Sequence, residues 1–114
     1  MLASGFGPDG VILTATLTND PDPDEDVFEV ALDQITVPVL IATHKRDDCP
    51  ATPPSDTDDL AAALTGSPKV KAKFFDGGYL PISENCSPLG PHGFFGVEYK
   101  VVNKIAEFVI EQSP

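Results

Sequence analysis

Runs of apolar and β-branched residues mark three candidate strands along the chain. Residues 10–17 are apolar or β-branched without clear alternation, as expected of a parallel strand that is covered on both faces. Residues 37–43 form the second candidate strand, in which Pro38 is tolerated because it lies at the beginning. In residues 70–75, Lys71 and Lys73 alternate with apolar positions, which is typical of an edge strand protected against further pairing. The pattern therefore predicts a small parallel sheet with one charged edge.

Two helices are also predicted, one from its capping and breaker residues and one from the spacing of its apolar residues. Residues 56–65 begin within Ser55-Asp-Thr-Asp58, which matches a capping box, and they precede the breakers Gly66 and Pro68. A closing helix is indicated by one apolar stripe, formed by Val97, Val101, Ile105, Phe108 and Val109. The order of these elements indicates an α/β fold of about three parallel strands, with one crossover helix and one closing helix.

The length of 114 residues allows one domain, spanning residues 1–114. Within it, residues 19–34 are expected to form an acidic loop, because the prolines and carboxylates of residues 19–26 oppose both helix formation and strand pairing. A calcium site in this loop is the alternative, but the glycine-turned ligand pattern of such sites is missing.

The net charge of the chain argues against two classes of binding partner. Seven Lys and Arg stand against 18 Asp and Glu, a formal net charge of −11, which repels nucleic acids and anionic membrane surfaces. No apolar run reaches the roughly 18–20 residues that cross a bilayer. Residues 1–8 lack the basic start and hydrophobic stretch of an export signal, so no targeting signal is recognised in the chain as written.

Candidate chemistry gathers on two loops that follow predicted strands. Asp47 and Asp48 follow the second strand, and His92 follows the third within Gly90-Pro-His-Gly-Phe-Phe95. Reactive side chains of open α/β sheets collect at the carboxyl ends of strands, so a carboxylate and an imidazole from these loops can meet. The alternative is that the acidic pair is a solvated turn and His92 an ordinary exposed histidine.

These two loops resemble segments of the α/β-hydrolase family. Val-Pro-Val-Leu-Ile-Ala-Thr-His-Lys-Arg-Asp47 is similar to the family's penultimate core strand and catalytic acid, and Pro-His92-Gly-Phe resembles its catalytic histidine loop. The resemblance covers residues 10–111 and implies a partial α/β-hydrolase fold. By this analogy Asp47 orients His92, the general base toward a serine. Asp48 is the alternative acid, and His44 stands where the family usually has glycine, as a neighbour rather than the base.

The serine nucleophile of this family is not found in the sequence. No Gly-x-Ser-x-Gly pentad occurs, and Ser4 has only one of the glycines. The resemblance therefore implies the carboxyl-terminal part of a serine hydrolase that cleaves an ester or related acyl bond, needs no cofactor and is inactive as this chain alone. The rival is a non-catalytic α/β interaction module. The two hypotheses differ at the open strand edge: the fragment predicts self-association or a complementing chain there, whereas the module would bind a partner through it.

The cysteines flank the two candidate loops. Cys49 lies close after the acid and Cys86 shortly before His92, and the resemblance to exported bacterial hydrolases favours a disulfide between them and a periplasmic or secreted full-length protein. Two reduced thiols are the alternative. A zinc site made of both cysteines with His44 and His92 lacks the usual paired-ligand spacing.

Overall fold

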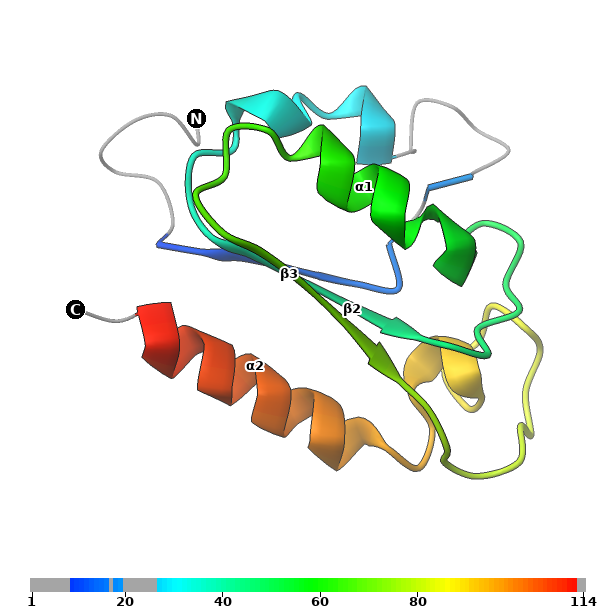
Figure 1. Ribbon diagram of the computed structural model, residues 1–114. Helices are drawn as coiled ribbons and strands as arrows, with labels where there is room; N and C mark the ends of the chain where they lie inside the picture. The colour runs from blue at the N-terminus through cyan, green and yellow to red at the C-terminus, as the bar shows by residue number, and fades with distance from the viewer. Residues whose placement is uncertain (1–8, 17, 20–26, 113–114) are drawn as a thin grey trace.

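The described residues form one sheet of three parallel strands in chain order. The computed structural model describes residues 9–16, 18–19 and 27–112. Its strands are β1 (Val11–Thr14), β2 (Val39–His44) and β3 (Val70–Phe75), with β2 in the middle. Helix α1 (Thr57–Ala63) covers one face and helix α2 (Glu98–Gln112) covers the other (Figure 1). The predicted α/β class, with three parallel strands and two helices, is confirmed.

Strand β2 is the centre of the core. All six of its residues are buried, so its sequence shows no alternation. Val39 and Ile41 pack with Leu60 on the α1 side, and Ala42 packs with Phe75 on the α2 side. Two neighbouring strands and two helices thus fix the direction in which β2 ends, and the candidate acid follows that end.

Strand β1 is shorter and more exposed than its sequence predicts. It spans four residues, three of which are half-buried, while Thr14 is exposed. The prediction of coverage on both faces is wrong here, because β1 pairs only with β2 and forms one edge of the described sheet. Ala15, at φ 44°, takes the chain out of the extended conformation, and Leu17 lies outside the described residues.

Helix α1 begins without the predicted capping box. The chain enters it through a 3₁₀ turn, η4 (Pro54–Asp56), and the N-cap residue Asp56 makes no side-chain capping hydrogen bond. Its backbone is helical, at φ −84° and ψ −2°, rather than extended as in a typical N-cap. The Asp56 carboxylate instead accepts a hydrogen bond from the Thr18 hydroxyl at 2.9 Å.

Helix α2 packs through a narrower stripe than predicted. Val101 and Phe108 are buried, whereas Val109 is half exposed because it lies at the rim of that face. Within the described part of the chain, no helix combines the length and the apolar character required to span a membrane.

The second half of the predicted acidic loop contributes to the core. Residues 27–34 contain two 3₁₀ turns, η2 (Val27–Glu29) and η3 (Leu32–Gln34). Leu32 and the following Ile35 are buried against the α1 side of the sheet. Residues 20–26 and Ser4 lie outside the described residues.

Candidate active site

Asp47 lies buried in the loop that leaves β2. Its backbone N–H donates to the His44 carbonyl at 3.1 Å, which closes a turn directly after the strand. Its Oδ1 accepts the backbone N–H of Cys49 at 3.0 Å, a local Asx turn that fixes the carboxylate. With only 1% of its side chain exposed, Asp47 points inward, toward the loop that carries His92.

His92 reaches this carboxylate from the 3₁₀ turn η5 (Pro91–Gly93). Its Nδ1 lies 3.2 Å from Asp47 Oδ2, and 20% of its side chain is exposed. The turn is tightly built, because a Cβ at Gly93 would collide with the backbone of Pro88. Phe94, in the left-handed region at φ 59°, then turns the chain toward α2. The two predicted residues are therefore in contact.

Thr52 is a third member of the site that the sequence analysis did not single out. Its hydroxyl donates to Asp47 Oδ2 at 2.8 Å and lies 3.1 Å from His92 Nδ1. A hydroxyl has one hydrogen, so with that hydrogen on the carboxylate, Nδ1 must be the donor toward both oxygens. The proton of a neutral His92 ring thus sits on Nδ1, and Nε2 carries the lone pair.

Asp47, Thr52 and His92 form a hydrogen-bonded array, in which Nε2 of His92 is the ring nitrogen that faces neither of the other two residues. It makes no hydrogen bond to any residue within the described ranges. A half-buried imidazole whose Nδ1–H is held by a buried carboxylate can accept a proton at Nε2, and the carboxylate stabilises the imidazolium that results. The arrangement is suited to general base chemistry.

Asp48 is placed differently. Its side chain is exposed, and its backbone carbonyl accepts a hydrogen bond of 3.4 Å from the Asn85 amide. Asp47 alone of the two aspartates contacts His92. The one-residue ambiguity left by the sequence is therefore decided by the direction in which the turn after β2 points each carboxylate.

His44 has no nitrogen available for catalysis. It is 1% exposed, its Nδ1 accepts the Arg46 backbone N–H at 3.0 Å, and its Nε2 lies 2.9 Å from the Gly77 carbonyl. Since Nδ1 accepts, Nε2 must carry the proton and donate it to that carbonyl. His44 thus joins the ends of β2 and β3.

A cysteine pair connects the two loops. The sulfurs of Cys49 and Cys86 lie 2.10 Å apart, at disulfide distance, with Cys49 buried and Cys86 exposed. The cross-link places the residues next to the Asp47 turn against the segment that leads to His92. No set of three or more His, Cys, Asp or Glu suited to hold a metal ion occurs among the described residues.

The neighbouring loop after β3 carries a perturbed carboxyl group. The Gly77 backbone N–H, which donates to Asp76 Oδ1 at 2.8 Å, lowers the pKa of Asp76, and the Arg46 guanidinium at 3.0 Å lowers this pKa further. Both partners favour the ionised form. Asp76 therefore helps to fix Arg46, whose own backbone N–H donates to His44.

Compared with protein-family models, curated proteins and solved structures, the chain matches none of them. Its chemistry has to be argued from the contacts of Asp47, Thr52 and His92 themselves.

Proposed function

We propose that this chain supplies the acid and the base of an α/β-hydrolase-like serine hydrolase that cleaves an ester or related acyl bond. One observation carries the proposal: a buried aspartate and a threonine hold Nδ1 of His92 while Nε2 is left without a partner in the described chain. The Asp47 loop also follows β2, which the resemblance equates with the strand before the catalytic acid, and His92 lies shortly before the closing helix α2, as the histidine loop of the resemblance does.

In this mechanism His92 Nε2 takes the proton of a serine hydroxyl as the serine oxygen attacks the acyl carbon. The resulting imidazolium is stabilised by Asp47, and Nε2 then gives the proton to the leaving group, so an acyl-serine remains. A water molecule then attacks the acyl-serine while His92 Nε2 takes its proton. Nε2 passes this proton to the serine oxygen, and the carboxylic acid product is released. Thr52 acts as a positioning residue, because it binds Asp47 Oδ2 and contacts the same ring nitrogen.

The serine itself is proposed to come from outside this sequence. Of the described serines, Ser67 donates to the Ile35 carbonyl and Ser83 accepts the Leu89 N–H. No described serine hydrogen-bonds to His92. Without a nucleophile and oxyanion donors the acid and base cannot form or stabilise an acyl intermediate, so this chain alone is expected to be inactive.

The open edge of β1 fits the same proposal. Only β2 pairs with β1 in the described sheet, and Thr14 of β1 lines a shallow groove of about 220 Å³ together with Phe94 and Val102 of the α2 side. We propose that the segment bearing the serine adds a strand here, and that without it two copies of this chain associate. Sedimentation should show concentration-dependent association, and a monomer at all concentrations would contradict this part.

A fluorophosphonate probe tests the proposal on the native protein that carries this sequence. We expect labelling of a serine outside residues 1–114, with loss of labelling in His92→Ala and strong reduction in Asp47→Ala. Asp48→Ala is the matched control and should label normally. Labelling of a serine within residues 1–114, or labelling that is unchanged in His92→Ala, would refute the assignment.

A further inference from the structure

The backbone of Cys49 holds both residues that contact His92 Nδ1. Its N–H donates to Asp47 Oδ1 at 3.0 Å, and its carbonyl accepts the Thr52 backbone N–H at 3.1 Å. The Asp47 carboxylate and the Thr52 hydroxyl in turn lie 3.2 Å and 3.1 Å from Nδ1 of His92. The geometry of the acid side of the array therefore depends on where Cys49 lies.

The disulfide ties Cys49 to the loop that leads to His92. Apart from the contacts of His92 itself, two links join the two loops within the described residues. One is the disulfide to Cys86, and the other is a hydrogen bond of 3.4 Å from the Asn85 amide to the Asp48 carbonyl. The disulfide is thus the strong link that holds the acid turn against the histidine loop.

One end of this bridge is accessible to a thiol. Cys49 is 2% exposed, whereas Cys86 is an exposed residue. A thiolate breaks a disulfide by attacking one sulfur and expelling the other, so the attack falls on Cys86 and Cys49 leaves. The sequence contains two cysteines, and both are in this bridge, so a thiol has no other disulfide to reduce within the chain.

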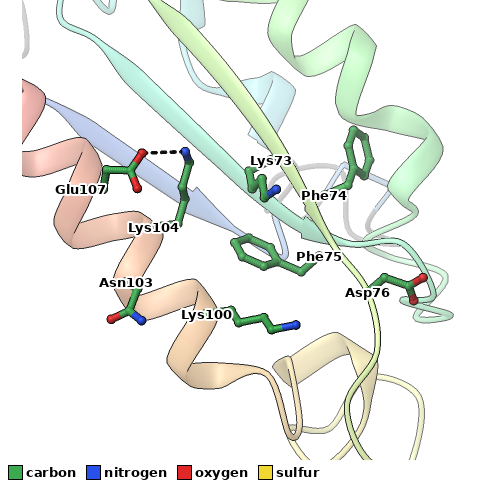
Figure 2. A pocket seen from close by; sticks show the side chains of 8 residues that line it. All are labelled: Lys73, Phe74, Phe75, Asp76, Lys100, Asn103, Lys104 and Glu107. Carbon is green, nitrogen blue, oxygen red and sulfur yellow. Dashed lines mark hydrogen bonds and ion pairs between the residues drawn. The ribbon is translucent and has the colours of Figure 1, made fainter.

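The sheet beside the site is held by contacts that do not include the bridge. The Phe75 ring points from β3 toward α2 (Figure 2) and packs in the core cluster on that side. His44 joins the ends of β2 and β3 through the Arg46 N–H and the Gly77 carbonyl. Neither core cluster of the described residues contains Cys49. Cleavage of the disulfide should therefore loosen the two loops and leave the sheet in place.

We propose that the Cys49–Cys86 disulfide is a redox switch of the acid–histidine array, which a dithiol opens. One thiolate of the dithiol attacks the Cys86 sulfur and expels the Cys49 thiolate, which takes up a proton. The second thiol then displaces Cys86, so the dithiol becomes a disulfide and gives two electrons and two protons to the bridge. The Asp47 turn is then no longer tied to the His92 loop. As a control of catalysis, this inference rests on the proposed function.

NMR of the ¹⁵N-labelled chain with and without dithiothreitol tests the switch independently of catalysis. At about pH 8, where an ordinary histidine ring is neutral, the oxidised chain should give the His92 ring ¹⁵N shifts of the Nδ1–H form. Dithiothreitol should move these shifts toward those of a free imidazole that exchanges between both tautomers, and oxidised glutathione should restore them. The ring shifts of His44 should stay unchanged, because its partners belong to the sheet.

Two outcomes of this measurement would overturn the proposal. Unchanged His92 shifts would show that the bridge does not hold the array. Equal changes in the rings of His44 and His92 would show that reduction disrupts the sheet as a whole rather than the two loops.

Matched variants separate the disulfide from the other link between the loops. Cys49→Ala/Cys86→Ala should show the reduced pattern of His92 shifts without dithiothreitol and should not respond to it. Asn85→Ala removes the hydrogen bond to the Asp48 carbonyl but keeps the bridge, so it should keep the oxidised pattern. A reduced pattern in Asn85→Ala, or an oxidised pattern in the double variant, would contradict the switch. The comparison of the wild type in its two redox states does not require the double variant to fold.

Fluorophosphonate labelling of the native protein distinguishes this inference from the proposed function. We expect the oxidised protein to be labelled, and labelling to be about tenfold slower or more after dithiothreitol, because small displacements of catalytic groups are costly. Labelling that is equally fast in both states would refute the switch. No labelling of the oxidised protein would refute the proposed function, while the His92 shifts would still decide whether the disulfide controls the array.

Discussion

The two histidines of this protein occupy contrasting surroundings at the carboxyl end of the sheet. His44 ends β2, is buried, and uses both ring nitrogens, one with the Arg46 N–H and one with the Gly77 carbonyl. His92 lies on η5, is half-buried, and uses only Nδ1 in contacts with the described residues. The same side chain therefore serves as a connector in one place and as a prospective base in the other. The difference lies in the number of nitrogens that the fold satisfies.

The largest expected effect comes from removing the cross-link beside His92. The Cys49→Ala/Cys86→Ala variant should lose about 4 kcal/mol of unfolding free energy, because the bridge closes a loop with a sequence separation of 37. Urea unfolding measures this loss. Reductant should lower the stability of the wild type by a similar amount and leave that of the variant unchanged. A wild type that reductant does not affect would show that the bridge contributes nothing.

The second prediction concerns the two histidines directly. His44→Ala should lose about 3 kcal/mol or more, because it leaves a cavity and deprives the Arg46 N–H and the Gly77 carbonyl of their partner. His92→Ala should lose only about 1 kcal/mol, since its ring is partly exposed. Urea midpoints compare the two variants. Equal losses of unfolding free energy would show that the two histidines do not differ in their contribution to stability.

The adjacent aspartates provide a matched pair. Asp47→Asn should cost about 2 kcal/mol, because the buried carboxylate accepts hydrogen bonds from Cys49 and Thr52 that one amide cannot fully replace. Asp48→Asn, on the exposed neighbour, should change the unfolding free energy by less than about 0.5 kcal/mol. Urea midpoints measure both changes. A larger effect at position 48 would favour the other acid.

A smaller effect is expected at Thr52. Thr52→Val keeps the volume but removes the hydroxyl that binds both Asp47 and His92, so about 1 kcal/mol should be lost. The ¹⁵N shifts of the His92 ring should also report a lower population of the Nδ1–H form, while those of the His44 ring stay unchanged. Altered ¹⁵N shifts of the His44 ring would mean that the hydrogen bonds of the two imidazole rings are coupled.

The smallest effect lies away from both histidines, at the pair Lys71–Glu111. The Lys71 ammonium, 2.6 Å from Glu111, lowers the pKa of that carboxyl below its usual 4.5. A carboxyl with a lowered folded-state pKa stabilises the fold fully above about pH 4.5 and loses this contribution as the pH falls through the folded value. Glu111→Gln should therefore show a slightly shallower loss of stability on acidification, measured by urea midpoints between pH 6 and pH 3. An identical pH dependence of stability in the wild type and in Glu111→Gln would show that the Lys71–Glu111 pair contributes nothing measurable.

Hydrophobic patterning along the chain was sufficient to predict the α/β class. Residues 70–75 form β3 as predicted, and the central strand and α1 lie within a few residues of their predicted bounds. The closing helix was predicted only from its apolar stripe, and α2 contains all of that stripe except Val97. Such patterns are local consequences of burial on one or both faces of an element. They were less informative for β1, because a run of apolar residues reads alike in a central strand and in an edge strand.

Asp47 and His92 could be nominated as site residues from the sequence alone, because both follow strands at the edge where α/β sheets carry their chemistry. Which aspartate contacts the imidazole, the participation of Thr52 and the saturation of His44 were decided only by the tertiary structure. These features depend on the directions in which loops distant in sequence point their polar atoms. A period of two or of 3.6 residues contains no information about those directions.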